Sequence, residues 1–350
     1  MTYIDLLQFL GVTPNHRTKT WMETEPRHIE ELLLKINKLL SQNDLEKRRT
    51  LEKIVARISI SRINDEVKQP NELFWSVTSD MLLSMYGDYI AKKGEQLLQE
   101  KGLRNIQQIL PLSDQKFLDL INETVVDSHC SANHPIFNFL KNEAGWEVLS
   151  EYLWAENLCD LNFVNILGFL MQGLEGVSGL EIARNFFDEI GEFQLDKFHT
   201  KLRRDMMYNV GLPILDEDWN IDTYLTPEYE HFNAYCSYGF RRDRKYRLIG
   251  MMLATEHLVP SQQEYVLSGW LRVGLPEAKM AYILEHIVGD VTHSQGWFNN
   301  VVKPNIANNL FRQTEILIGV HQHLEILGRL YDAMYQSFKS DIFPSKWTSF

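Results

Sequence analysis

The chain has 350 residues with 44% hydrophobic and 23% charged side chains, and its formal net charge is -12 at pH 7. This composition predicts a globular protein with a substantial core, and the acidic balance argues against nucleic-acid binding, which needs concentrated lysine and arginine. The N-terminal segment lacks a secretory signal pattern, and no run of 18 uninterrupted apolar residues could span a membrane, so we expect a cytoplasmic protein without membrane contact.

Helical periodicity dominates the first 130 residues. Apolar residues recur at spacings of three and four over 27–60, 71–100 and 114–126, which is typical of amphipathic helices. The turn-rich segment SHCSANHP at 128–135 is the best candidate linker. We therefore predict an N-terminal helical region over 1–130 and a second domain over 131–350.

The second domain shows the same periodicity. Its predicted helical segments are 136–174, 179–210, 245–257, 261–273, 276–301 and 305–340. The basic cluster FRRDRKYR at 240–247 is short, and its arginines could bind a substrate carboxylate or a reductase. We favour the interpretation as a solvated loop. Alternating strand patterns and internal repeats are absent, so we predict an all-α fold. Three widely spaced cysteines, Cys130, Cys159 and Cys236, indicate reduced thiols.

One helical segment, LEHIVGDVTH at 284–293, carries a stripe of ligand-type side chains. On a helix, His286, Asp290 and His293 fall within roughly 60° of one another, so their side chains could meet a common metal ion. The alternative is a metal-free, hydrogen-bonded polar network. Because glycine and four β-branched residues make the segment a poor helix former, we also expect its order to depend on metal binding.

Three other segments place glutamates among apolar side chains. They are Glu156 in EYLWAENL, Glu189 ten residues before His199 in NFFDEIGEFQLDKFH, and Glu256 in MMLATEHL. Taken singly, each could be a helix cap or part of a salt bridge. Together with the stripe they favour a metal site, because a carboxylate among apolar side chains needs a compensating cation and can bridge two irons.

In this order the residues resemble the haem-oxygenase-like diiron oxidases and oxygenases, which are iron-containing redox enzymes. The resemblance covers residues 134–300 and includes the His-Pro helix start in HPIFNFL at 134–140. It implies an all-α, haem-oxygenase-like helical bundle, the fold also found in pyrroloquinoline quinone synthase and the thiaminase-like proteins. The N-terminal 130 residues resemble the dimerisation region of the streptozotocin-pathway N-oxygenase, which implies a homodimer.

The resemblance implies a cofactor of two Fe(II) per chain, with dioxygen as co-substrate. Its ligands would be Glu156, Glu189, His199, Glu256, His286, Asp290 and His293. In that scheme the first iron is held by Glu156, His199 and His293, the second by His286 and Asp290, with Glu189 bridging and Glu256 completing the set.

Two of these assignments remain open on the sequence alone. Glu192 is a rival to Glu189, because it lies on nearly the same helical face. Glu151 and Asp160 share the predicted helix of Glu156. By contrast, HQHLE at 321–325 has a metal-type composition, but alternate residues diverge by about 200° on a helix, and we interpret it as structural or solvated.

The function implied by the resemblance is oxygenation of a small molecule. We expect N-oxygenation of an amine-bearing, amino-acid-derived metabolite in natural-product biosynthesis, supported by an external reductant or reductase. Oxidative C–C cleavage or desaturation of an amino acid by the same iron site is the first alternative. The alternative of another class is a cofactor-free or non-catalytic helical binding protein.

Overall fold

The computed structural model describes residues 26–41, 44–64, 77–100, 110–173, 175–212, 223–307 and 309–340, and these ranges contain no β-strand. The all-α prediction is confirmed. The N-terminal helices are α2 (Pro26–Ser41), α3 (Leu45–Asn64), α4 (Val77–Glu100) and α6 (Asp114–Val126). The following helices are α7 (Pro135–Asn142), α8 (Trp146–Asp160), α9 (Phe163–Gly168), α10 (Gly176–Glu189), α11 (His199–Asn209), α12 (Thr226–Gly239), α13 (Lys245–Arg272), α14 (Ala281–Gly296), a π-helix (Trp297–Val302), α15 (Lys303–Ile306) and α16 (Leu310–Lys339).

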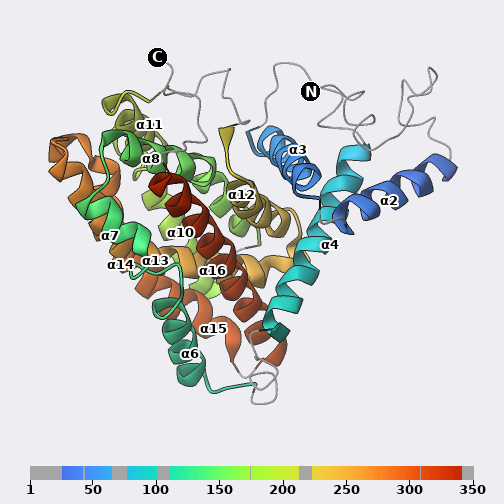
Figure 1. Cartoon of the computed structure of the whole chain (residues 1–350). Coiled ribbons are helices and arrows are strands. Elements are labelled where there is room, and N and C mark those ends of the chain that lie inside the picture. Colours follow the sequence, from blue (N-terminus) through green and yellow to red (C-terminus); the bar gives the residue numbers. More distant parts are fainter. Residues whose placement is uncertain are drawn as a thin grey trace.

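Helices α13 and α16 form the centre of the bundle, with α7 and α14 against α13 and α12 against both central helices (Figure 1). The sequence predicted a break between 257 and 261, but α13 continues through Pro260. Proline removes one helical hydrogen bond. Buried apolar residues on both sides of it, including Leu258 and Val266, hold the two halves in one helix.

Two glycines allow the backbones of α13 and α16 to approach each other closely. A Cβ atom at Gly319 would collide with the carbonyl oxygen of Arg247, and one at Gly250 with the carbonyl oxygen of Ile316. Because both collisions are with backbone atoms of a facing helix, no side-chain rotation can relieve them. The close packing of α13 against α16 therefore requires glycine at both positions.

We expect Gly319→Ala to lower the free energy of unfolding by roughly 1–3 kcal/mol, because the added methyl must separate two packed helices. Gly87→Ala on α4 is the matched control, since its new Cβ would lie 3.9 Å from Ser237, an ordinary contact. That control should be neutral or stabilising, by up to about 1 kcal/mol. Urea denaturation of both variants measures the difference, and equal stability would refute the close-approach explanation.

The N-terminal helices pack directly on this centre. Helix α3 lies against α12, and α4 lies against α12 and α16. Arg247 of α13 joins them: it is 1% exposed, and its guanidinium contacts Glu315 at 2.7 Å and Glu95 of α4 at 2.9 Å. The interpretation of 240–247 as a solvated loop was therefore wrong for Arg247, because acidic partners on two other helices neutralise its charge. The boundary at residue 130 and dimerisation stay predictions.

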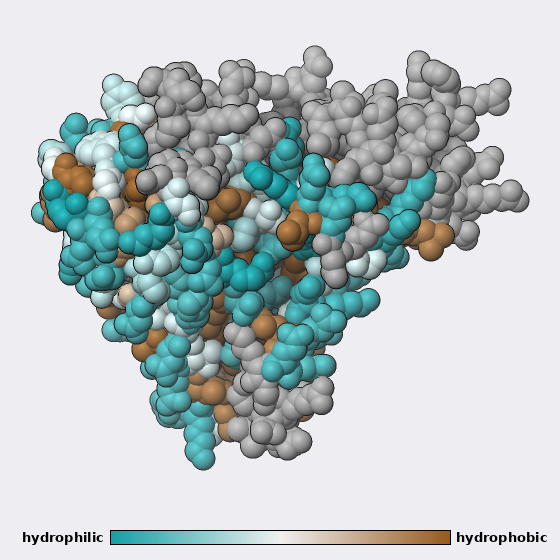
Figure 2. Space-filling model, in the orientation of Figure 1, coloured by the Kyte–Doolittle hydropathy of each residue, from teal (hydrophilic) through white to brown (hydrophobic). Residues whose placement is uncertain are grey.

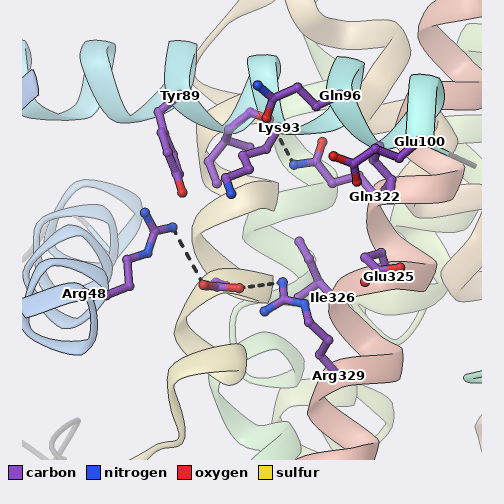
Figure 3. A pocket seen from close by; sticks show the side chains of 12 residues that line it. Arg48, Tyr89, Lys93, Gln96, Glu100, Gln322, Glu325, Ile326 and Arg329 are labelled. Carbon is purple, nitrogen blue, oxygen red and sulfur yellow. Dashed lines mark hydrogen bonds and ion pairs between the residues drawn. The ribbon is translucent and has the colours of Figure 1, made fainter. Parts of the chain in front are cut away.

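A groove of about 350 Å³ opens between these N-terminal helices and the bundle. Arg48 and Arg329 lie on opposite sides of it (Figure 3), and both reach Glu230, at 3.7 Å and 2.6 Å. Its charged groups thus already neutralise one another in part. In Figure 2, hydrophilic side chains cover much of the visible described surface, with smaller apolar areas between them.

The three cysteines, two of them buried, form no disulfide bond with one another, in keeping with the predicted reduced thiols. Among the described helices, none combines the length and the apolar character that crossing a bilayer requires.

Candidate metal centre

The predicted ligand stripe lies on α14. His286, Asp290 and His293 face inward with 8%, 3% and 6% of their surface exposed. Val288, a poor helix former, is 72% exposed on the outer side, and Val291 is 48% exposed. The predicted helix and its inward stripe are confirmed, while the dependence of its order on a metal stays a prediction.

One group of ligand atoms joins three helices. Glu189 ends α10, His199 begins α11 and His286 lies on α14, and one ligand atom from each falls within 4.8 Å of the others. Nδ1 of His199 is 2.9 Å from Oε2 of Glu189. Nδ1 of His286 donates to the Tyr282 carbonyl oxygen at 2.6 Å, which leaves its Nε2 lone pair for a metal.

A tight turn brings Glu189 and His199 together. Gly191, Glu192 and Phe193 all have positive φ, at 69°, 52° and 64°. A Cβ on Gly191 would lie 2.5 Å from the Lys197 carbonyl carbon, so only glycine fits there. Because α10 ends at Glu189, Glu192 leaves the helical face and pairs with Lys197 at the surface, at 3.1 Å. Of the two rivals, the structure places Glu189 in the site.

A second group again contains Glu189, now with Glu256 of α13 and His293 of α14. Nδ1 of His293 is 3.4 Å from Glu256 and 3.2 Å from Asp290. Its Nε2 is 3.1 Å from Asp188. Glu189 is thus common to both groups, and six of the seven predicted ligands converge on one buried centre.

The electrostatics of this centre favour a cation. Burial raises the pKa of Asp290 well above its ordinary value, and the charge of Glu256 raises it further. Burial also raises the pKa of Glu256, against the opposing effect of His293. Burial acts to lower the pKa of His293, but these two carboxyl groups raise it to about 12. Burial, with the charge of His199, lowers the pKa of His286 to about 4, so this imidazole is neutral at pH 7.

These residues fit an iron site chemically. Imidazole nitrogens beside carboxylate oxygens suit iron, and buried carboxyl groups close together are stabilised by a shared cation. Oε1 of Glu256 is buried and has no hydrogen-bond partner among the described residues, which is unfavourable unless another ligand satisfies it.

Comparison with known families supports iron as the metal. Residues 150–328 match the family model described as "Iron-containing redox enzyme", over more than half of the chain. The chain belongs to the iron-containing redox enzymes. No curated protein matches it. Membership of this family supports an oxidoreductase that contains iron, and the matched range includes all seven predicted ligands.

The seventh predicted ligand, Glu156, lies outside both groups. It is 3.5 Å from the guanidinium of Arg203, which also contacts Asp160 at 3.0 Å. Asp160 is influenced by the metal centre: burial raises its pKa, and the charge of Glu189 raises that pKa further. The other rival on α8, Glu151, acts on Glu228 of α12 instead: burial raises the pKa of Glu228, and the charge of Glu151 raises it further. The role of Glu156 as a ligand stays a prediction.

Sequence reasoning missed two residues at the centre. Asp188 was missed because only its neighbour Glu189 was considered as a ligand, although consecutive acidic residues at a helix end can reach different partners. Arg203 was missed because arginine is rarely fully buried, yet it is 0% exposed. It donates to the side chain of Asn157 at 2.8 Å and to the Leu153 carbonyl oxygen at 2.6 Å. The only signal was its position one turn after His199.

A third group of ligand-type residues lies apart from the centre and outside the matched range. His134 caps α7, accepts from the Ile136 amide at 3.1 Å, and contacts Asp332 of α16 at 3.2 Å. His129 reaches the same carboxylate at 3.0 Å. These contacts explain the His-Pro helix start as a structural link between α7 and α16.

Binding of ferrous iron should release at least one proton per chain at pH 7. The pKa of His293 is raised to about 12, so its imidazole is protonated at neutral pH, and a metal ligand must be neutral. Because the proton competes with the metal, apparent affinity should rise with pH below that value. Anaerobic calorimetric titrations in buffers of different ionisation enthalpy measure the protons released. Zero release would contradict this charge assignment.

Proposed function

We propose that this chain is an O2-dependent non-haem diiron oxygenase. The observation that carries the proposal is the position of Glu189, which belongs to both three-residue groups. A carboxylate has two oxygens and can bridge two metal ions, whereas one imidazole nitrogen cannot. The iron-containing family of the chain supports iron as the metal.

The residues that would hold the iron are those of the two groups, together with Asp290. Two ferrous ions there would supply electrons to dioxygen and so allow oxidation of an organic substrate. The burial of Glu189, Glu256 and Asp290, at 2%, 2% and 3% exposure, keeps bulk water from the centre. A dry centre strengthens charge interactions and protects reactive species from water.

The substrate class we propose is a small amine-bearing metabolite derived from an amino acid, and the reaction is N-oxygenation. Conversion of R–NH2 to R–NHOH takes one oxygen atom from dioxygen, and the other leaves as water with two protons and two electrons. Those electrons require an external one-electron or flavin-type reductant. Oxidative cleavage or desaturation of an amino acid is the alternative reaction, and a homodimer is the proposed assembly.

The test is oxygen consumption by the iron-loaded chain with a reductant and a panel of amines and amino acids. N-oxygenation predicts amine-dependent consumption and a product containing one atom from isotope-labelled dioxygen. A shortened or dehydrogenated product without that atom would favour the alternative reaction. Absence of substrate-dependent consumption across the panel, with iron bound, would contradict the oxygenase proposal.

A further inference from the structure

A cavity of about 70 Å³ lies between α8, α12, α13 and α16, and the charge of Glu189 in the candidate metal centre acts on Asp160 of its lining. Glu156 and Asp160, the two α8 carboxyl groups held by Arg203, line one part of it. The rest is largely apolar, with Leu258, Leu327 and Leu330 among its walls. A cavity of this size holds about five to seven water-sized groups. It can therefore accept a small organic molecule.

A chain of hydrogen bonds along one wall fixes the proton positions. Thr255 donates to the Met251 carbonyl oxygen at 3.0 Å, so its own oxygen accepts from the Tyr235 hydroxyl. With that hydrogen used, the Tyr235 oxygen can only accept from Nδ1 of His323, 3.2 Å away. The hydrogen of His323 is therefore on Nδ1, which also points to Nε2 of His231 at 3.2 Å.

With its hydrogen on Nδ1, His323 has a second ring nitrogen, Nε2, that can accept a hydrogen bond but has no donor. Burial lowers the pKa of His323 well below its ordinary value, so the ring is neutral and has a single N–H. Its Nε2 consequently carries a lone pair. That atom is buried and has no hydrogen-bond partner among the described residues, although the side chain is only 1% exposed and lines the cavity. An unpaired buried acceptor is unfavourable, and a ligand with an N–H or O–H group would satisfy it.

The charges around the cavity select among such ligands. Three carboxyl groups line it, from Glu156, Asp160 and Glu228, whereas no lysine or arginine is among its described lining residues. The guanidinium of Arg203 reaches two of these carboxyl groups from outside the lining. The oxygens of these carboxyl groups can accept hydrogen bonds from a ligand amine or ammonium group, whereas a ligand carboxylate would find no lysine or arginine to pair with among the described lining residues.

We propose that this cavity binds the amine end of a carboxylate-free aliphatic amine, whose N–H group donates to Nε2 of His323. The inference rests on the proposed oxygenase function for its role as a substrate pocket, and it narrows the substrate to a decarboxylated amine rather than a free α-amino acid. The alkyl part of the amine packs against the leucine walls, and its nitrogen lies on the side of the acidic residues of α8.

The test is binding of three probes to the full chain, loaded with ferrous iron under nitrogen and followed by calorimetry. The probes are n-pentylamine, its α-carboxylated counterpart norleucine, and pentanoate. We expect n-pentylamine to bind at least about tenfold more tightly than the other two. Equal or tighter binding of norleucine or pentanoate would overturn the proposal.

Two variants connect that binding to the cavity. His323→Leu should weaken n-pentylamine binding at least about tenfold, because it removes the acceptor. Val259→Phe keeps His323 but fills part of the cavity with a larger side chain, so it should also reduce binding. This second variant tests the proposal even if His323→Leu does not fold. Circular dichroism identifies such a defect. Unchanged binding in either folded variant would overturn the assignment.

The outcome is independent of the oxygenase test. Binding that depends on His323, without oxygen consumption, would support the cavity and refute the proposed function. Oxygenation of other substrates, with no n-pentylamine bound, would support the function and refute the cavity assignment.

Discussion

Glu189→Ala should abolish stable iron binding at both positions of the centre. Glu189 is shared by the two ligand groups, so its removal takes a ligand from each. It also leaves His199 without its carboxylate partner at 2.9 Å. Replacement of residues that only support a ligand typically weakens metal binding 10–100-fold, so loss of a shared ligand should weaken it by at least about 100-fold. Iron content after anaerobic loading and desalting is the measurement.

Glu192→Ala is the matched control for this variant. Glu192 is three residues away, carries the same charge and was a rival on the sequence, but it pairs with Lys197 at the surface. Its replacement should leave iron content unchanged. If Glu192→Ala lost iron while Glu189→Ala retained it, the geometry of the turn at 190–198 would be wrong.

Arg203→Met should lower the free energy of unfolding by roughly 3–5 kcal/mol, because it removes the cation from a buried ionic cluster. Arg203 is 0% exposed and lies within 3.5 Å of the carboxyl oxygens of both Glu156 and Asp160. Methionine has a similar length and apolar character, so the loss is mainly one of charge. Urea denaturation measures the loss. The control is Arg204→Met, at the exposed neighbouring arginine, which should change the free energy of unfolding by less than about 0.5 kcal/mol.

Removal of the two carboxylates that lose their partner in Arg203→Met should restore part of the lost free energy of unfolding. We expect the triple variant Arg203→Met, Glu156→Gln, Asp160→Asn to be more stable than Arg203→Met alone, because neutral amides are less unfavourable when buried. If the triple variant is no more stable, the effect of Arg203 comes from its packing and its bonds to α8 rather than from its charge.

The spacing of particular residues was sufficient to predict much of the fold and of the centre. Apolar periodicity indicated the helices, and His286, Asp290 and His293 share one face because helix geometry leaves no alternative at that spacing. The choice between Glu189 and Glu192 could not be made from periodicity. It depends on where α10 ends, and two non-glycine residues adopt positive φ in the following turn.

Features that depend on contacts between distant segments could not be predicted. The short basic segment at 240–247 gave no sign that Arg247 would be buried, because its partners, Glu95 and Glu315, are far away in the sequence. Similarly, HQHLE was interpreted as structural, and helix geometry does separate its two histidines. Nothing in that pattern indicated that His323 would meet His231 and a cavity.

The most direct test of the diiron proposal is the iron content of the wild-type chain after anaerobic ferrous loading and removal of unbound metal. The proposal predicts two irons per chain, with a transient visible absorption on exposure to oxygen that is lost in His286→Ala and Asp290→Ala. A chain that retains at most one weakly bound iron and consumes no oxygen with any amine would contradict it, and would favour a helical binding protein whose buried histidines and carboxylates form a polar network.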